Sequence, residues 1–303
     1  MTGPSDPRSD AGTDARSDPG SVPETPTATF ERLRPVLLGL AYRLLGSMWD
    51  AEDVVGDAYL RWVGVDADEV REPRAFLITV VSRLALDRLR SARATREAYV
   101  GPWLPEPVSL DDGPLDVAER RDALSYATLH LMERLSPPER GVFVLREAFG
   151  LPYEEIAGIL STTAANARQL LHRAHTHLGE QERFRPSDAE HTRLLTGFLA
   201  AAGAGDLEAL AGMLTDDARA WTDGGGRTRA ALRPILGREK VVAFVAGLAR
   251  RYPVDGTQLV EANGRPAVRL RRGELDQLVL LDVRDGRIAT VFAVLNPDKL
   301  SHV

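Results

Sequence analysis

Hydrophobic residues recur at helical spacing in the segment 29–98, where three or four positions separate successive apolar side chains. In the first part of this segment the apolar positions are Leu33, Val36, Leu37, Leu40, Leu44 and Leu45. Residues 47–50 offer a break and a cap, and a second helix is predicted over 51–63. A longer third helix is predicted over 74–96, with Pro73 in its first turn, where proline is tolerated. The pattern therefore predicts an all-helical domain.

A helix–turn–helix pattern lies within a second helical segment, residues 116–182. A short helix is predicted over 154–160, with its apolar residues on one side, and a turn over 161–165. Asn166 is a suitable N-cap for a second helix, because its side chain can accept a hydrogen bond from an orphan backbone N–H. That helix, over 167–178, leaves these polar side chains on its outer face: Arg168, Gln169, His172 and Arg173.

This polar face has the chemistry of a DNA recognition helix. Arginine can bond guanine and glutamine can bond adenine in the major groove, while a helix N-terminus can hold a phosphate. The alternative is an ordinary helical hairpin with a solvated outer face. The expected DNA-binding residues of this helix are Asn166, Arg168, Gln169, His172 and Arg173.

The segment 188–303 has a different pattern, in which helices give way to strands. Helices are predicted over 191–202, 206–214 and 238–252, and strands over 219–222, 258–262, 267–271, 278–283 and 288–295. Asn263-Gly264 and Asp285-Gly286 are hairpin signals, since both central positions of such a turn favour positive φ. Helices followed by an antiparallel meander predict an α+β domain.

Two proline-rich segments are predicted to lack regular structure. Residues 1–28 carry five prolines among small polar residues, and such a segment cannot offset its ordering entropy. Residues 99–115 form a linker, in which three prolines within six residues favour an extended path. Trp103 and Leu104 stand side by side in that linker, so we expect them to anchor it on a neighbouring domain.

Charge is unevenly distributed, although the net charge is only −6. Residues 50–69 hold seven acids and one base, whereas residues 83–96 hold five arginines and one acid. Neighbouring blocks of opposite sign indicate two partners of opposite charge, and the alternative is two solvated helix faces.

Several classes of protein are disfavoured by composition. The chain has no cysteine, which excludes disulfides, thiolate metal sites and cysteine nucleophiles and fits a cytoplasmic location. The start of the chain lacks a signal pattern, and the longest apolar stretch, 241–249, is too short to span a bilayer. His172, His175 and His177 do not share one helix face, so we expect no metal. We also expect no cofactor, no catalytic residue and no membrane partner, because phosphate-binding loops, zinc-protease helices and nucleophile elbows are missing.

Three segments together resemble the extracytoplasmic-function sigma factors of bacterial RNA polymerase. WDAEDVVGDAYLRW (49–62) resembles the polymerase-binding helix of that family. PRAFLITVVSRLALDRLR (73–90) is similar to its helix that reads and melts the −10 element. LSPPER (135–140), EIAGIL (155–160) and RQLLHRA (168–174) are similar to its −35-reading domain, in the family's order and spacing.

The resemblance implies a role for each charge block. It implies that the acidic helix binds core polymerase, through its β′ and β subunits, with Asp50, Glu52, Asp53 and Asp57. It also implies that the basic helix faces promoter DNA with Arg83, Arg88, Arg90 and Arg93, where arginine neutralises phosphates and releases counterions. Gly56 stands where the family usually has glutamine, and Arg83 stands where asparagine is common, so no base preference is carried over to Arg83.

The segment 188–303 resembles a SnoaL-like or cystatin-like domain, a cone of curved sheet closed by helices, of the kind fused to one subgroup of these sigma factors. The motifs that carry this resemblance are WLPEP (103–107), DGGG (223–226) and NPDKL (296–300). The subgroup implies a regulator built into the chain. Our hypothesis is that these residues set whether the DNA-reading domains can separate: Trp103, Leu104, Pro105, Asp223, Gly224, Gly225, Gly226, Asn296, Pro297, Asp298, Lys299 and Leu300.

Two other functions are weighed against a sigma factor with a regulatory domain. The first is an enzyme, because SnoaL-like cones elsewhere catalyse isomerisation with a buried base, but Asp223 beside three glycines is a poor setting for one. A small-molecule ligand of this domain that biases the domain arrangement is kept open. The second is a helix–turn–helix regulator with a ligand-sensing domain, which would bind duplex DNA without polymerase.

Overall fold

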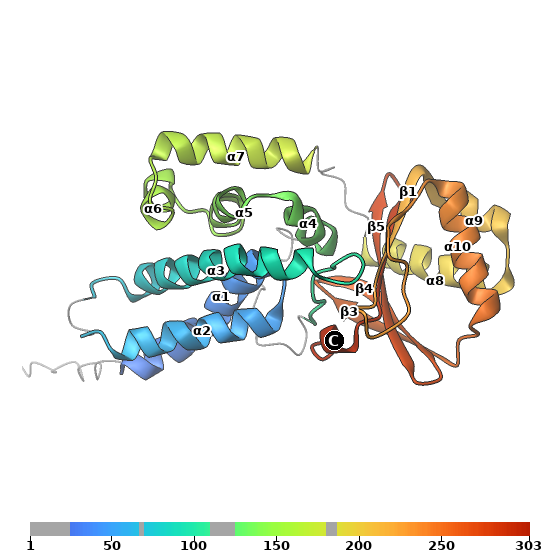
Figure 1. The fold of residues 1–303 in the computed structure, drawn as a ribbon, viewed down its shortest axis with the longest axis horizontal. Helices are drawn as coiled ribbons and strands as arrows, with labels where there is room; N and C mark the ends of the chain where they lie inside the picture. The colour runs from blue at the N-terminus through green and yellow to red at the C-terminus, as the bar shows by residue number, and fades with distance from the viewer. Residues whose placement is uncertain (1–24, 67–69, 110–124, 180–186) are drawn as a thin grey trace, which may run out of the picture.

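The computed structural model describes residues 25–66, 70–109, 125–179 and 187–303 (Figure 1). The predicted N-terminal tail lies outside these residues up to position 24, and so does the linker from position 110. Two helical units lie on one side of the molecule, and an α+β unit lies on the other (Figure 1). Over the described residues, no helix has the length and apolar character needed to cross a membrane.

The first helical unit consists of α1 (Pro26–Leu45), α2 (Met48–Val63) and α3 (Pro73–Glu97). Helix α1 begins at Pro26, so the prediction of a disordered segment reaching residue 28 is wrong at its end. Thr25 caps the helix, with its side chain accepting a hydrogen bond from Ala28 N at 3.2 Å. Proline in the first turn has no N–H to leave unpaired, which is why the helix can start there.

The second helical unit carries the helix–turn–helix. Its elements are α4 (Tyr126–Leu131), η2 (Met132–Arg134), α5 (Pro137–Phe143), η3 (Val144–Ala148), α6 (Tyr153–Ile159) and α7 (Ala164–Leu178). The prediction that Asn166 caps α7 is wrong, because the cap is Thr163 and its hydroxyl accepts from Asn166 N at 3.1 Å. Asn166 lies instead in the first turn and donates to Thr162 Oγ1 at 2.8 Å.

The two helical units share one continuous hydrophobic core. Leu86 of α3 and Leu160, which follows α6, meet at Gly141 of α5. A Cβ atom at Gly141 would lie 3.1 Å from Leu86 Cδ2 and 3.2 Å from Leu160 Cδ2, so glycine permits this close approach. The units are therefore packed against each other rather than joined only by a linker.

The C-terminal unit is an α+β domain, as predicted. Its elements are α8 (Asp188–Ala204), α9 (Leu207–Met213), β1 (Leu214–Asp223), β2 (Ile235–Leu236), α10 (Arg238–Arg251), β3 (Gly256–Ala262), β4 (Arg265–Arg272), β5 (Leu275–Arg284), β6 (Arg287–Val294) and η4 (Pro297–Lys299). The sheet order is β2-β1-β6-β5-β4-β3, and only the β1–β6 pair is parallel. Both predicted hairpin turns are confirmed, with positive φ at Asn263-Gly264 and Asp285-Gly286.

The two faces of this sheet have different neighbours, because alternate residues of a strand point to opposite sides. One face packs on α8, α9 and α10, which cover it as seen at the right of Figure 1. The other face carries Trp221, Leu280 and Phe292, and it packs against Leu104 of the linker and Tyr126 of α4. Part of the core of the C-terminal domain is thus supplied by the linker and the helical units.

Candidate interdomain site and nucleic-acid interface

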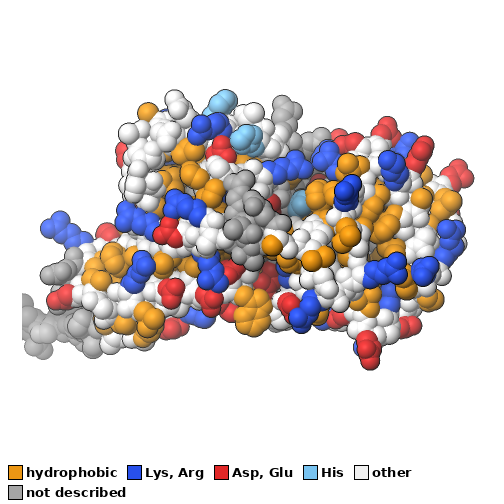
Figure 2. Space-filling view, in the orientation of Figure 1, with side chains coloured by type: hydrophobic (Ala, Val, Ile, Leu, Met, Phe, Trp, Pro, Cys, Tyr) orange, Lys and Arg blue, Asp and Glu red, His pale blue; other side chains and the backbone are white. Residues whose placement is uncertain are grey.

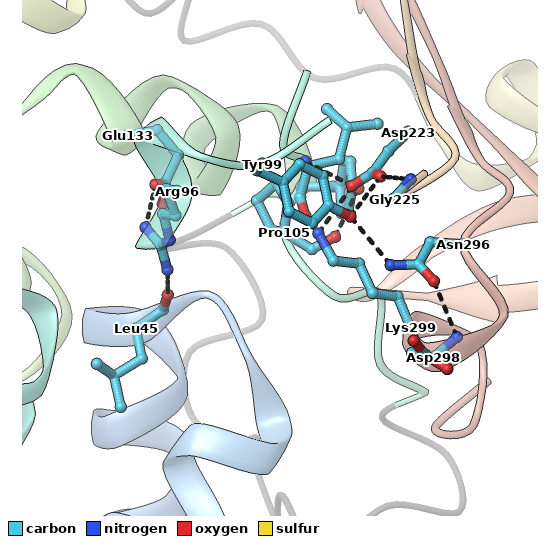
Figure 3. Close-up of polar contacts among 12 residues, drawn as sticks. Leu45, Arg96, Tyr99, Pro105, Glu133, Asp223, Gly225, Asn296, Asp298 and Lys299 are labelled. Carbon is cyan, nitrogen blue, oxygen red and sulfur yellow. Dashed lines mark hydrogen bonds and ion pairs between the residues drawn. The ribbon is translucent and has the colours of Figure 1, made fainter. Parts of the chain in front are cut away.

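Asp223, at the end of β1, is fully buried, and its carboxylate accepts four hydrogen bonds (Figure 3). Two donors come from the linker: Tyr99 OH at 2.7 Å and Leu104 N at 2.9 Å. Gly225 N donates at 3.0 Å, and Lys299 Nζ donates at 2.7 Å. A buried carboxylate is tolerated only when it is paired and hydrogen-bonded, and here the linker supplies two of the four donors.

Lys299 connects the same carboxylate to the linker backbone and to two aromatic rings. Its ammonium donates to Leu104 O at 2.5 Å and lies 4.1 Å from the ring centroid of Trp103 and 4.9 Å from that of Tyr99. Burial lowers the pKa of Lys299 to about 8, against the opposing attraction of Asp223. The other cation near Trp103 is Arg96 of α3, 3.7 Å from the ring centroid, so Trp103 joins the first helical unit to the C-terminal tail.

The glycine loop is in contact with both the tail and the linker. Gly225 has φ +58°, and a Cβ atom there would lie 2.4 Å from Asn296 Nδ2 and 2.9 Å from Tyr99 OH. Asn296 Nδ2 in turn donates to Tyr99 OH at 3.0 Å (Figure 3). A Cβ atom at Gly224 would lie 2.1 Å from Thr228 O in the same loop, and one at Gly226 would lie 3.3 Å from the side chain of Val100. The structure therefore brings the WLPEP, DGGG and NPDKL motifs to one place.

The remaining residues of these motifs have separate positions. Pro105 O accepts a hydrogen bond from Tyr126 OH of α4 at 2.8 Å. Leu300 is buried in the core beneath the linker, and Pro297 opens η4. Asp298 lies at the surface, where it pairs with Arg227 at 3.3 Å. Asp298 thus does not take part in the buried cluster around Asp223.

Glu106 of the linker is a functional candidate that the sequence analysis did not single out. Its carboxylate accepts from Met48 N at 2.8 Å, at the start of α2, and shares a hydrogen bond with His302 Nδ1 at 2.5 Å. Tyr42 OH donates to Glu106 O at 2.6 Å and accepts from Asn263 Nδ2 at 2.7 Å. Burial raises the pKa of Glu106, while its hydrogen bonds oppose that rise. The one sign of this contact in the sequence is that a charged residue, Glu106 itself, stands among the apolar residues of WLPEP.

The two helical units are also joined by a buried ion-pair network. Glu133 accepts from Arg96 of α3 and from Arg140 of α5, and Arg96 Nη2 donates to Leu45 O at 2.6 Å (Figure 3). Arg140 is only 1% exposed and extends to Arg43 O at 3.4 Å. Removing Glu133 would leave the largely buried Arg96 and Arg140 without their ion-pair partner, and breaking a buried pair in this way costs about 3–5 kcal/mol. The network therefore stabilises contact between the units.

The predicted polymerase-binding acids and DNA-binding arginines meet each other. Arg88 of α3 lies 2.7 Å from Asp50 and 3.4 Å from Asp53 of α2. Glu52 is half-buried and Asp57 is exposed on the same helix. Gly56 is exposed too, with open space around its Cα, so a longer side chain there would project into solvent.

The other arginines of α3 differ in their surroundings. Arg83 Nη2 donates to Gly158 O at 2.9 Å, and Arg83 Nε donates to Ile159 O at 3.3 Å, at the end of α6. Arg90 is exposed and pairs with Asp87 at 2.5 Å. The side chain of Arg93 lies outside the described part of the chain. Arg83 is exposed, and its guanidinium is bonded to the helix–turn–helix.

The predicted recognition helix α7 keeps its polar face in solvent. Gln169 and His172 are exposed, and histidine side chains are visible over α7 in Figure 2. Arg168 pairs with Glu154 at 3.3 Å, and Arg173 pairs with Glu139 at 3.4 Å. Across the described ranges, no group of three or more His, Cys, Asp or Glu side chains could hold a metal ion.

Comparisons with known proteins agree with this arrangement. The family described as Sigma-70 region 2 matches residues 29–95, and Sigma-70, region 4 matches residues 126–178. The chain is 38% identical over 288 residues to the ECF RNA polymerase sigma factor SigJ of Mycobacterium tuberculosis, covering 90% of this chain and 92% of that protein. It is 31% identical over 281 residues to the probable ECF RNA polymerase sigma factor SigI of the same species, covering 90% and 94%. The crystal structure of M. tuberculosis SigJ superposes with a TM-score of 0.76 and 35% identity, covering 91% of this chain and 100% of that one.

Proposed function

This chain belongs to the extracytoplasmic-function family of RNA polymerase sigma factors, and we propose that its C-terminal domain holds the two promoter-reading units in a closed arrangement that must open before initiation. As a sigma factor, the chain binds core RNA polymerase and promoter DNA to start transcription and is not itself an enzyme. Because that work is done on the chromosome, we place it in the cytoplasm.

The closed arrangement is incompatible with reading both promoter elements. Elements at −10 and −35 are separated by about 25 base pairs, which is roughly 85 Å of B-DNA at 3.4 Å per pair. Here Arg83 of the −10-reading helix is bonded to Gly158 O in the helix–turn–helix, 2.9 Å away. The two units also share one core. They therefore have to separate by tens of ångströms on a promoter.

The single observation that carries the proposal is the bonding of the linker to Asp223. The linker joins the two promoter-reading units, so it has to be free for them to separate. Tyr99 and Leu104 both donate to this fully buried carboxylate, and Lys299 holds Leu104 O as well. Separation of the units would expose the Asp223–Lys299 pair and break these hydrogen bonds. The C-terminal domain thus favours the closed state.

We also propose which residues contact polymerase and which contact promoter DNA. We assign polymerase contact to Asp50, Glu52, Asp53 and Asp57, contact with the −10 region to Arg83, Arg88, Arg90 and Arg93, and contact with the −35 region to Asn166, Arg168, Gln169, His172 and Arg173. Within the first helical unit Arg88 pairs with Asp50 and Asp53, so a partner that binds either helix at these residues has to break that pair. The pair is exposed, and such pairs contribute about 0–1 kcal/mol, so it is a weak barrier beside the buried cluster.

A reversible bridge between the units tests the proposal. The chain contains no cysteine, so Arg83→Cys with Gly158→Cys creates a unique thiol pair that a short, disulfide-containing bismaleimide can join. We expect the bridged chain to bind core polymerase but to give no promoter-dependent transcript, and reduction of the bridge should restore the transcript.

The control is the same double variant blocked with a monofunctional maleimide, which carries the same substitutions without the bridge. The blocked chain has to give a promoter-dependent transcript for the comparison to count. An equal amount of transcript from the bridged chain would then refute the requirement for opening.

A further inference from the structure

A cavity of about 430 Å³ lies where α4 of the second helical unit faces the sheet of the C-terminal domain. We propose that it binds a small aromatic organic acid bearing a hydroxyl or carbonyl group, and that the bound acid stabilises the closed arrangement. The volume lies within the range of small-molecule sites, roughly 300–1,000 Å³. The proposal that the site exists is independent of the proposed function, whereas its effect on opening rests on it.

The floor of the cavity is built by cross-strand neighbours on three strands. Arg219 of β1 lies opposite Thr290 of β6, which lies opposite Asp282 of β5. The next row along the same face is Trp221, Phe292 and Leu280. Residues opposite each other on one sheet face are close neighbours, so a polar row borders an aromatic row. Such a floor suits a molecule with a polar end and a flat apolar body.

Two buried histidines in the wall each have a ring nitrogen with no hydrogen-bond partner among the described residues. His130 of α4 is 8% exposed with Nδ1 unpaired, and His191 of α8 is 4% exposed with Nε2 unpaired. His130 lies edge-on to Trp221, with ring centroids 4.5 Å apart. Burial lowers the pKa of each histidine to about 4, so both are neutral near pH 7. An unpaired buried polar group is unfavourable, and a ligand hydroxyl or carbonyl would satisfy it.

The charges around the cavity favour an anion. Arg265 is paired with Asp188 at 3.0 Å, and Arg284 lies 3.9 Å from Asp217. Four arginines line the cavity, namely Arg134, Arg219, Arg265 and Arg284, against two acids, Asp217 and Asp282. Burial raises the pKa of Asp282, which disfavours its negative charge. Arg219 and Arg134 form no ion pair with any described residue. Basic side chains gather at the junction of the helical units and the C-terminal domain in Figure 2. A carboxylate matches the fork of a guanidinium, which makes an organic acid the expected ligand class.

A ligand in this cavity would couple to domain opening. His130 and Arg134 belong to the second helical unit, whereas Arg219 and Asp282 belong to the C-terminal domain. The two walls of the cavity separate when opening carries the second helical unit away from the C-terminal domain. A ligand that needs both walls binds the closed state more tightly than the open state, and it therefore shifts the population toward the closed state.

Calorimetric titration of the full chain with 1-hydroxy-2-naphthoate tests the site, with 1-naphthol, which lacks only the carboxylate, as the uncharged comparison. We expect saturable one-to-one binding of the acid and at least tenfold weaker binding of 1-naphthol. Arg219→Gln should weaken binding of the acid at least tenfold, whereas Arg250→Gln, an exposed arginine on α10 that does not line the cavity, should leave it unchanged. His191→Phe, checked for an unchanged melting temperature in the absence of ligand, should also weaken it.

Absence of saturable binding, or equal binding by the Arg219→Gln and Arg250→Gln chains, would overturn the proposal. The effect on opening is read separately, as a decrease in promoter-dependent transcripts when the acid is added. Binding that is lost in Arg219→Gln but leaves transcription unaltered would keep the site and refute its coupling to opening, so failure of the two proposals is distinguishable.

Discussion

The substitution Tyr99→Phe removes one hydroxyl from the linker and leaves its ring in place. That hydroxyl donates to Asp223 at 2.7 Å and accepts from Asn296 at 3.0 Å. Gly225 N still donates to the same carboxylate oxygen, so the anion is not left unpaired. Hydrogen bonds to charged groups contribute about 1.5–3 kcal/mol. Because this bond joins the linker to the C-terminal domain, its loss should fall on the closed-to-open equilibrium and raise the open-to-closed ratio about 10- to 150-fold.

Single-molecule energy transfer measures this ratio directly. Arg74 of α3 and Thr176 of α7 are exposed, and replacing each with cysteine gives one dye site per helical unit in a chain without other cysteines. The ratio of the low-transfer to the high-transfer population should increase at least tenfold in Tyr99→Phe. Tyr252→Phe is the matched control, because that hydroxyl bonds only the neighbouring Arg251 side chain. An unchanged population in Tyr99→Phe, or an equal change in both variants, would contradict the argument.

Two further predictions concern the glycine loop and a buried histidine. Gly225→Ala and Gly273→Ala carry similar backbone strain at φ +58° and +61°, but only the Gly225 Cβ would collide with the linker, 2.9 Å from Tyr99 OH. Only Gly225→Ala should therefore raise the open population in the energy-transfer assay. For His130, burial lowers the pKa from 6.5 to about 4. Between these two pH values the unfolded chain binds more protons than the folded chain, so the free energy of unfolding decreases as pH falls. Urea unfolding should show about 2 kcal/mol less stability at pH 5 than at pH 7 from this group. His130→Gln should remove that loss and the exposed His172→Gln should not, and equal pH slopes in all three chains would show that His130 is not the cause.

The charge blocks illustrate where sequence reasoning stops. Their opposite signs predicted two partners, and the segments that carry them match Sigma-70 region 2. Nothing in the spacing indicated that Arg88 lies on Asp50 and Asp53, because residues 35 and 38 positions apart meet only through the packing of α2 on α3. Arg83 was expected at DNA because it lies in the basic block. Its bond to Gly158 O was not indicated either, because the two residues are 75 positions apart.

The error at Asn166 has a local cause. Thr162, Thr163 and Asn166 can all serve as caps, and propensity alone does not decide between them. The turn ends early enough for the Thr163 hydroxyl to take the cap position, which adds Ala164, Ala165 and Asn166 to α7. Helix boundaries are decided by small differences of this kind, whereas the existence of the helix follows from its apolar stripe.

By itself the sequence determined the local elements: the helical spacing in the first two units, the helix–turn–helix, and the hairpins at Asn263-Gly264 and Asp285-Gly286. These depend on interactions among residues a few positions apart, so a short window contains their cause. Only the tertiary structure decided that Tyr99, Leu104 and Lys299 converge on Asp223, across 124, 119 and 76 positions of chain. A buried carboxylate has no local signature, because what makes it tolerable is the set of donors that the fold brings to it.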